Sequence, residues 1–409
     1  MIQGSSHNRA QTHRKPPAIV LGVGETALGT IRSLHRAGIE VLYTSDKSDI
    51  AGLSRFHTAL GDWPKGVLGP ADLEAWLDAT GLETAVLMPC SDAWTQSVSR
   101  LSNAAGNRYK HWTPAPEIVD LMVDKNLFRE VLERLDLPHP RSFSLQRDSS
   151  AWEIPDNVYE SAFLKPFDSL TFFAAFGVKG FSVSDADDAL NKVKVAWAEG
   201  IEMMIQEYVP GPPTNHYFID GYRSKDGSKM QLLARQRLQM YPPDFGNSTD
   251  MVTVPLQPLQ QAVDTLQRLF EHTGFHGIFS AEFKLDDRDK LYKILEVNCR
   301  PWWFIDYADR CGLSVCQPAY ADALGLPIPD QEPYKIGKRG TYPVYDWEAY
   351  KNSKDRGAAA FLTMIFDWTR SYQPVFMWSD PVPAFVNFYR LAKGMISRRI
   401  ARNREKTPA

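Results

Sequence analysis

The sequence predicts a protein of the α/β and α+β classes, built from several packed subdomains. The chain of 409 residues is too long for one small core. A β-α-β pattern opens the chain, and short paired strands fill its middle. The predicted parts are a flexible tail (1–15), an N-terminal Rossmann-like subdomain (16–115), a larger domain (116–325) with a small lobe (about 141–206), and a largely helical C-terminal extension (326–409).

Composition narrows the class of protein. Hydrophobic residues make up 44% of the chain, which is typical of a globular core, and the net charge of -3 gives no indication of a nucleic-acid partner. The four cysteines lack zinc or redox spacing, so we expect reduced thiols and a cytoplasmic location. No signal peptide or membrane-spanning segment is expected.

The first β-α-β unit begins with a buried strand that runs into a glycine turn, Ala18–Gly24. A helix to Gly38 and a second strand, Ile39–Tyr43, complete it. Ala27 occupies the place of the third glycine of a dinucleotide fingerprint, so a plain α/β subdomain is favoured over a nicotinamide site with Asp46 as its ribose acid.

Another apolar strand, Thr84–Pro89, ends in Cys90, Ser91 and Asp92. Ligand-binding loops follow the carboxyl ends of strands in open α/β sheets. Ser91 and Asp92 are therefore candidates for substrate contact. Capping of the helix that follows is an equally good interpretation.

The larger domain begins with a helix capped by Asp124 and ended by Pro138. From Phe143 to Gln206 the pattern predicts short strands with one helix, 185–199, between them. The next expected elements are listed in chain order: a strand at Met203–Val209, a hairpin of 217–221 and 230–237, a helix at 257–272, and paired strands at 277–285 and 291–298.

The last of these strands leads into the most informative segment, Leu295–Arg300. Side chains two apart in a strand share a face, so Glu296, Asn298 and Arg300 should point together, with Leu295 and Val297 on the other face. Glu282 on the partner strand can join them. Carboxylate and amide oxygens suit Mg²⁺, whereas the solvated face of an edge strand is the simpler alternative.

Two lysines upstream lie in apolar surroundings: Lys125 at a helix start and Lys165 within Phe163–Phe167. An ammonium group in such a strand needs an anionic partner or a path to water. A surface position is the simpler interpretation for Lys125. Lys165 is the stronger candidate for an anion-binding residue.

The order of these residues resembles that of the ATP-grasp superfamily, over roughly residues 18–320. The positions that carry the resemblance are Asp124, Lys125, Lys165, Gln206–Val209, Glu282, Glu296, Asn298 and Arg300. The segments Arg235–Arg237, Tyr241–Thr249 and Glu296–Trp303 look like the carboxylate-amine ligase branch that includes D-aspartate ligases. The resemblance implies an ATP-grasp fold in which the small lobe is a lid.

The resemblance also implies roles for single residues. Cofactor contacts are implied for Lys125 and Lys165 (ATP phosphates), Gln206, Glu207, Tyr208 and Val209 (adenine), and Asn215 or His216 (ribose). Metal contacts to one or two Mg²⁺ ions are implied for Glu282, Glu296 and Asn298. Catalytic roles are implied for Arg300, at the transferred phosphoryl group, and for Arg235 or Arg237, which replace a lysine and serve either phosphate or a substrate carboxylate.

One departure from the family pattern concerns the lid loop. A Gly/Ser-rich loop is usual after the second lysine, but this chain has Asp168–Phe173. Ser169, Thr171 and Lys179 are the candidate lid contacts. Cys299 should point into the core, and we expect Trp302 and Trp303 to pack rather than bind substrate.

The implied activity is ligation of a small carboxylate, such as an amino acid, to an amine, through an acyl phosphate and with release of ADP and phosphate. A non-catalytic nucleotide-binding or regulatory protein is the main alternative. A carboxylase-like acceptor is a weaker one, because the chain has no biotin-carrier segment. The substrates are not defined by the sequence.

The segment 385–404 predicts a basic amphipathic helix. Its apolar stripe is Phe385, Phe388, Tyr389, Ala392, Ile396 and Ile400, and its basic residues are Arg390, Lys393, Arg398, Arg399 and Arg402. Packing on the chain's own surface or on a second subunit, as in a homodimer, is favoured. Peripheral contact with an anionic membrane is the alternative.

Overall fold

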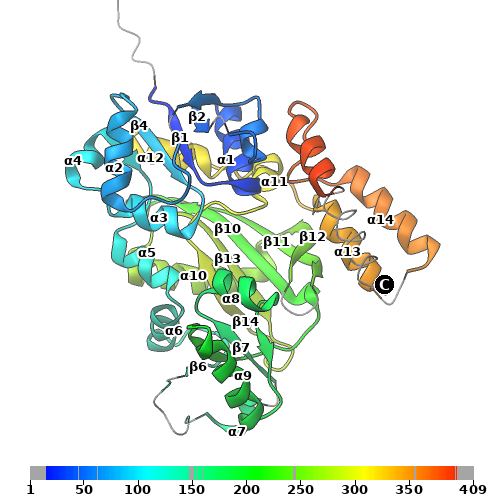
Figure 1. Ribbon diagram of the computed structural model, residues 1–409. Coiled ribbons are helices and arrows are strands. Elements are labelled where there is room, and N and C mark those ends of the chain that lie inside the picture. The colour runs from blue at the N-terminus through cyan, green and yellow to red at the C-terminus, as the bar shows by residue number, and fades with distance from the viewer. Residues whose placement is uncertain are drawn as a thin grey trace, which may run out of the picture.

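The computed structural model describes residues 15–391 and 393, with 45, 62, 146, 148–151, 153, 160, 243–245 and 354–355 excepted. Figure 1 shows three sheets stacked along the molecule, with the C-terminal helices at one side. The described residues form a mixed α/β fold with one parallel sheet and two largely antiparallel ones. No described helix is long and apolar enough to cross a membrane.

The N-terminal sheet is parallel and has the strand order β3-β2-β1-β4-β5. Its strands are β1 (Ala18–Leu21), β2 (Val41–Thr44), β3 (Thr58–Leu60), β4 (Ala85–Pro89) and β5 (Tyr109–His111). The helices are α1 (Gly24–Arg36), α2 (Pro70–Ala79), α3 (Asp92–Ser99) and α4 (Asn103–Arg108). Gly22 is required in the first turn, because a Cβ there would lie 2.6 Å from the Cys90 Cβ.

The central sheet has six strands in the order β14-β13-β10-β11-β12-β15. They are β10 (His216–Arg223), β11 (Met230–Tyr241), β12 (Asn247–Val254), β13 (Gly277–Leu285), β14 (Tyr292–Asn298) and β15 (Arg339–Thr341). Apolar side chains of one sheet face pack against α5 (Pro116–Val123), α6 (Lys125–Arg134) and α10 (Gln260–Thr273). The opposite face is therefore left for polar residues.

The small lobe holds a four-stranded sheet in the order β6-β9-β7-β8. Its elements are β6 (Ser142–Ser144), α7 (Asp156–Tyr159), β7 (Ala162–Pro166), α8 (Ser169–Phe176), β8 (Phe181–Ser182), α9 (Ala186–Ala198) and β9 (Met203–Glu207). The predicted helix at 185–199 is confirmed as α9, but the prediction of a single helix in this lobe was wrong, because α7 and α8 also form. Residues 168–173, read as a loop, start α8, where Asp168 accepts a hydrogen bond from the Thr171 amide and Phe172 packs against Phe176.

The C-terminal extension packs back against the rest of the chain. It follows α11 (Ile305–Cys311) and α12 (Cys316–Ala323) and contains β15, α13 (Pro343–Asn352), α14 (Ala358–Arg370) and a helix at 382–391. Strand β15 pairs antiparallel with β12 and forms one edge of the central sheet. This strand was not predicted, because three residues carry too little periodicity.

Candidate functional site

The candidate site is built on the antiparallel pair β13 and β14. Glu282 lies opposite Glu296, and Ser280 lies opposite Asn298. A bulge follows Glu282, and it places Ile294 rather than Leu295 in the core. The predicted side for Val297 is confirmed, and that for Leu295 was wrong, because strict alternation does not include a bulge. Cys299 is fully buried, as predicted.

Glu282 is held by two side chains that approach the same oxygen. Arg237 Nη2 donates to Glu282 Oε1 at 3.0 Å, and His216 Nδ1 lies 2.8 Å from it. Burial alone would raise the pKa of Glu282, but Arg237 and His216 hold it well below its usual range. Among the described residues, nothing donates to Oε2, so this oxygen can serve as a ligand for a cation.

Glu296, Asn298 and Arg300 form a short chain of hydrogen bonds. Asn298 Nδ2 donates to Glu296 Oε1 at 3.1 Å, and Arg300 Nη2 donates to Asn298 Oδ1 at 2.9 Å. Arg300 also forms a bidentate pair with Asp92, at 2.8 and 3.2 Å. Ser91 caps α3, as the capping interpretation predicts, whereas the pairing of Asp92 with Arg300 was not predicted.

The described residues contain no group of three His, Cys, Asp or Glu side chains arranged to hold an ion. The candidate ligands are two carboxylates and one amide. This donor set fits a hard cation that keeps water or substrate oxygens in its other positions. Mg²⁺ is therefore compatible with the residues present.

Basic side chains from the small lobe and α6 approach these carboxylates. Lys125 Nζ donates to the Phe167 carbonyl at 2.7 Å, which ties α6 to the end of β7, the strand that carries Lys165. Desolvation, and next the charge of Lys165, lowers the pKa of Lys125 to about 8, while Glu296 opposes the shift. The charges of Lys165 and Glu296 thus both act on Lys125, and two lysines near one carboxylate favour a polyanionic ligand.

Lys179 approaches the same carboxylates from the lobe. Its Nζ donates to Asn247 Oδ1 at 2.6 Å and joins the lobe to β12. Desolvation lowers the pKa of Lys179, and Glu296 and Glu282 oppose the change. The sequence offered Lys179 together with Ser169 and Thr171. Thr171 instead donates its hydroxyl to Asp168, and the Ser169 side chain lies outside the described part of the chain.

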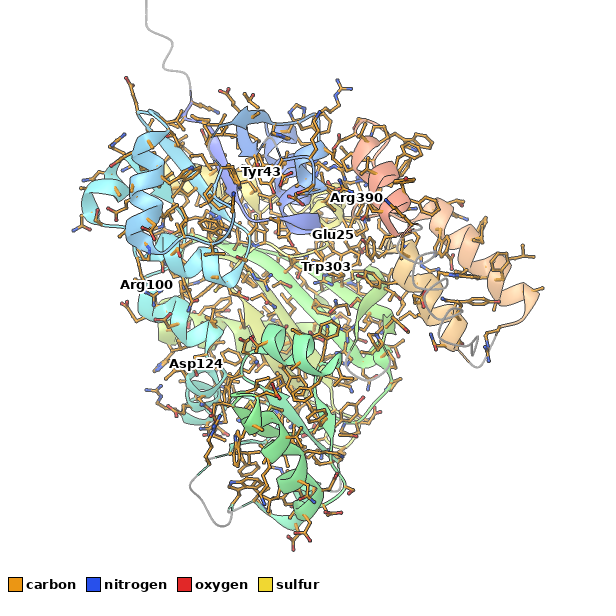
Figure 2. All side chains as sticks on the ribbon, in the orientation of Figure 1. Glu25, Tyr43, Arg100, Asp124, Trp303 and Arg390 are labelled. Carbon is orange, nitrogen blue, oxygen red and sulfur yellow. The ribbon has the colours of Figure 1, made fainter. Side chains whose placement is uncertain are left out.

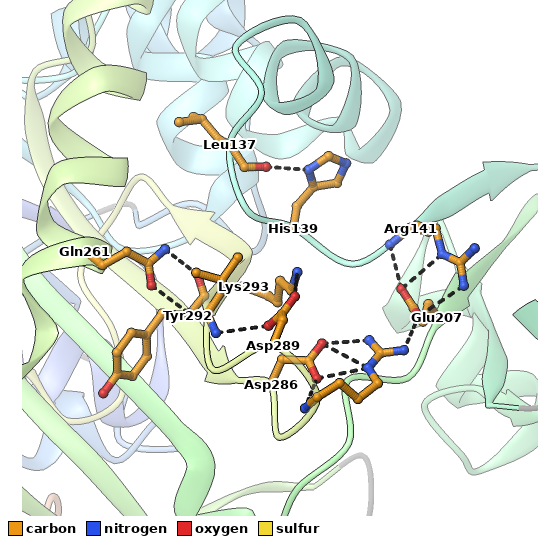
Figure 3. Close-up of polar contacts among 11 residues, drawn as sticks. Leu137, His139, Arg141, Glu207, Gln261, Asp286, Asp289, Tyr292 and Lys293 are labelled. Carbon is orange, nitrogen blue, oxygen red and sulfur yellow. Dashed lines mark hydrogen bonds and ion pairs between the residues drawn. The ribbon is translucent and has the colours of Figure 1, made fainter.

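The hinge between the lobe and the central sheet is organised around Glu207, the last residue of β9 (Figure 3). Arg141 and Arg288 both pair with Glu207, and Arg288 also pairs with Asp286. The two arginines hold the pKa of Glu207 below its usual range, against the effect of burial. Arg288 lies in the turn of the β13–β14 hairpin, so the hinge is fixed to the strands of the candidate metal site.

The other predicted hinge residues are inward-facing. Gln206 donates to Ser142 Oγ at 2.8 Å, Tyr208 lies under the Lys284 ammonium at 4.1 Å from its ring centre, and Val209 is buried. Asn215, the alternative ribose contact, donates to the Leu285 carbonyl at 3.0 Å. Side chains of 206–209 are thus largely occupied. The backbone amides of Glu207 and Tyr208 already donate to the carbonyls of Arg141 and Ser161, so the remaining backbone groups of this segment are the surface that can read a base.

The two arginines of β11 have different partners in the structure. Arg237 contacts Glu282, whereas Arg235 is fully buried against Asp220, with Nε 2.6 Å from Oδ2. Ser280 donates to Asp220 Oδ1 at 2.7 Å, and the Arg235 guanidinium stacks on Phe218 at 3.9 Å. Arg235 therefore lies beside the site but is committed to a structural pair.

An aromatic cluster with one carboxylate was missed by sequence reasoning. Tyr342 donates its hydroxyl to Glu25 Oε1 at 2.7 Å, and Tyr342, Tyr345 and Trp303 pack with ring centres 4.8 to 5.9 Å apart. Trp302, by contrast, is buried and packs as expected. Glu25 and Trp303 lie between the N-terminal subdomain and the central sheet (Figure 2). The residues come from three distant segments, so no local motif could reveal them.

Known proteins similar to this chain include a curated enzyme and several solved structures. No model of a protein family matches the chain. A D-aspartate ligase of Enterococcus faecium is 22% identical over 228 residues, and the match covers 53% of each protein, so the chain spans about half the length of this curated relative.

Solved structures match a larger part of the chain. N5-carboxyaminoimidazole ribonucleotide synthetase from Thermotoga maritima is 17% identical, with a TM-score of 0.54 and coverage of 78% of each chain. L-amino acid ligase from Bacillus licheniformis is 14% identical (TM-score 0.54, covering 76% of this chain and 74% of that one). The MgADP-bound biotin carboxylase domain of the Hydrogenobacter thermophilus 2-oxoglutarate carboxylase is 15% identical (TM-score 0.61, 80% and 74%). These proteins share one fold with this chain.

Proposed function

We propose that this chain, which has the ATP-grasp fold, is an ATP-dependent carboxylate-amine ligase that forms an amide or peptide bond. The observation that carries the proposal is the pairing of Glu282 with Glu296 across β13 and β14, with Lys125 and Lys179 close enough to act on their charges. Carboxylates facing lysines fit a complex of a divalent cation with phosphate oxygens. The D-aspartate ligase and L-amino acid ligase among the similar proteins support the same class of reaction.

The reaction balances without a protein nucleophile. A substrate carboxylate oxygen attacks the γ-phosphorus of ATP, the bond to the bridging oxygen breaks, and ADP leaves. An amine then attacks the acyl carbon of the acyl phosphate, loses a proton, and inorganic phosphate leaves as the amide forms. Both steps depend mainly on positioning and on neutralising negative charge.

The side chains divide this work. Mg²⁺, held by Glu282, Glu296 and Asn298, would neutralise charge on the phosphates. Lys125, Lys165 and Lys179 add positive charge from the lobe side, and Arg237 both orients Glu282 and faces the transferred group. Arg300, fixed by Asp92, would stabilise the acyl phosphate. The backbone at Glu207 and Val209 would bind adenine.

His216 takes a different position in this proposal from the ribose contact implied by the resemblance. Burial lowers the pKa of His216, and its Nδ1 faces Glu282. We assign it to orienting that carboxylate, and leave the ribose to polar groups of the loop after the hinge.

The test is release of ADP in the presence of Mg²⁺ and pairs drawn from a panel of amino acids and amines, with mass detection of the condensed product. The ligase predicts ADP and product only when both partners are present. The main alternative, a nucleotide-binding regulatory protein, predicts ATP binding with neither. Binding of ATP without ADP release for any pair would favour that alternative.

A pH dependence follows from Lys125. Its ammonium loses a proton as the pH rises through about 8, so attraction for phosphate should fall there. We expect the KM for ATP to be about tenfold higher at pH 9 than at pH 7. Lys125→Arg should keep a flat profile, because a guanidinium stays charged. Identical profiles for the two proteins would contradict the assignment.

We place the amine substrate at Glu25, against the rings of Tyr345 and Trp303. An ammonium group is attracted by a carboxylate and by aromatic faces. No described Lys, Arg or His forms an ion pair with Glu25, and Tyr345 is 37% exposed, so the cluster is open to a ligand. Helix α1 starts at the carboxyl end of β1, where open α/β sheets bind ligands.

Glu25→Gln is therefore expected to raise the KM for the amine by about tenfold or more, with the KM for ATP unchanged. Glu83→Gln, a change at an exposed residue of the same subdomain, serves as the control. A normal KM for the amine in Glu25→Gln would remove Glu25 from the amine site.

A cytoplasmic location and a homodimer remain predictions. The four cysteines are free and buried, which suits a reducing compartment. Light scattering of the purified protein tests the dimer.

A further inference from the structure

The last described helix turns its apolar side outward. Phe385, Phe388 and Tyr389 are 67%, 67% and 66% exposed, and Trp378 just before the helix is 86% exposed. The helix lies on the chain's own surface, as one of the two favoured interpretations predicts, but it does so through its other side, and packing of the stripe on a second subunit stays a prediction. Ala392, Ile396 and Ile400, which continue the predicted stripe, lie outside the described residues. Large aromatic side chains gathered in water are unfavourable, and they mark an interaction surface.

Contacts on the opposite side of this helix fix its apolar side toward solvent. Arg390 donates to the carbonyls of Ser48 and Lys47, and Asn387 donates to the Tyr342 hydroxyl. Ala384 packs on the core between the N-terminal subdomain and α11. The helix therefore presents one side to the protein and the other to solvent (Figure 2 labels Arg390 on it).

The segment before the helix is anchored just as firmly. Arg32 and Asp380 form a buried ion pair at 3.1 Å. Arg32 also donates to the carbonyls of Pro374 and Val375. These contacts fix the segment before the helix to the core, so the fold itself places the aromatic rings in solvent.

A second group of exposed apolar residues lies in the same extension. Leu362 and Phe366 of α14 are 65% and 56% exposed. Figure 1 shows α14 and the last helix along the same side of the molecule. Exposed apolar side chains thus occur on both of these helices of the extension.

The positive charge that follows the exposed rings in the sequence favours an anionic partner. Lys393 is exposed on the same helix, and the 14 residues 393–406, which follow the anchoring Arg390, include six basic side chains and one acidic one in a chain whose net charge is -3. A helix with aromatic residues on one side and basic residues around it is typical of proteins that lie in the headgroup region of an anionic bilayer. A second copy of a weakly acidic chain offers less complementary charge.

We propose that the exposed side chains of Trp378, Phe385, Phe388 and Tyr389 dock this protein on an anionic lipid surface. The rings enter the headgroup region, and the basic residues that follow Arg390 in the sequence contact lipid phosphates. Docking of this kind does not require a membrane-spanning helix. The proposal is independent of the ligase assignment, since it rests on a different surface.

Sedimentation with vesicles tests it on the full chain. Vesicles of phosphatidylcholine with about one third phosphatidylglycerol should bind the protein, and high salt should weaken the binding. Combined Phe385→Ser, Phe388→Ser and Tyr389→Ser substitutions should lower the partition coefficient by at least about tenfold. Val67→Ser with Val195→Ser, at 48% and 53% exposed positions elsewhere, is the matched control.

Three outcomes would overturn the proposal. They are absence of binding to the anionic vesicles, equal binding to pure phosphatidylcholine, and unchanged binding of the triple variant. Light scattering of the same proteins tests the alternative partner, which is a second copy of this chain. A dimer that the triple substitution disperses, without vesicle binding, would assign the surface to a second copy.

Discussion

Replacement of Glu296 by Gln is expected to lower kcat for ADP release by about a thousandfold. The substitution keeps the size of the side chain and its hydrogen bond with Asn298, but removes the negative charge that faces Glu282 across the strand pair. A neutral amide binds Mg²⁺ far more weakly than a carboxylate. The Mg²⁺ concentration required for half-maximal activity should rise with the loss of turnover.

Glu271→Gln supplies the control for this experiment. It is the same chemical change at an exposed position of α10, where Glu271 accepts a hydrogen bond from Gln267. Full activity is expected. If Glu296→Gln kept the turnover and the Mg²⁺ dependence of the unchanged protein, Glu296 would not be a metal ligand.

Asp220→Ala is expected to lower the free energy of unfolding by about 3–5 kcal/mol, because it leaves the Arg235 guanidinium buried without its anion. The Arg235 and Asp220 side chains are 4% and 0% exposed, so water cannot replace the lost partner. Urea denaturation, followed by circular dichroism, measures the change.

The double variant Asp220→Leu with Arg235→Met separates the two consequences of this pair. Apolar residues in place of both charges should recover most of the lost stability. If Arg235 is only structural, the double variant should also retain a normal KM for ATP. A large rise in that KM would return Arg235 to the phosphate-binding residues, and a loss of less than about 1 kcal/mol in Asp220→Ala would refute the buried-pair argument.

The parts of the site that could be predicted lie on single strands. Alternation in β13 and β14 was enough to place Glu282, Glu296 and Asn298 on one face, because the pleat imposes it. The same rule misplaced Leu295, since a bulge adds a residue without a mark in the composition. Helix α8 was missed because a single short apolar run gives no clear period.

The parts that could not be predicted depend on contacts between distant segments. Arg288 meets Glu207 from 81 residues away, and Tyr342 meets Glu25 from 317 residues away. Each of these side chains is ordinary in its local sequence. Their partners are selected by the packing of the three sheets, which only the folded chain defines.

Strand β15 has a consequence for how the protein can be trimmed. The solved structures with this fold match 76–80% of the chain, which invites removal of the C-terminal extension as an accessory part. A chain cut before Arg339 would leave β12 as an open edge with unpaired amide and carbonyl groups, a template for aggregation. It would also strip Arg32 of Asp380 inside the core. The extension completes the central sheet, and we expect a chain trimmed of it to aggregate.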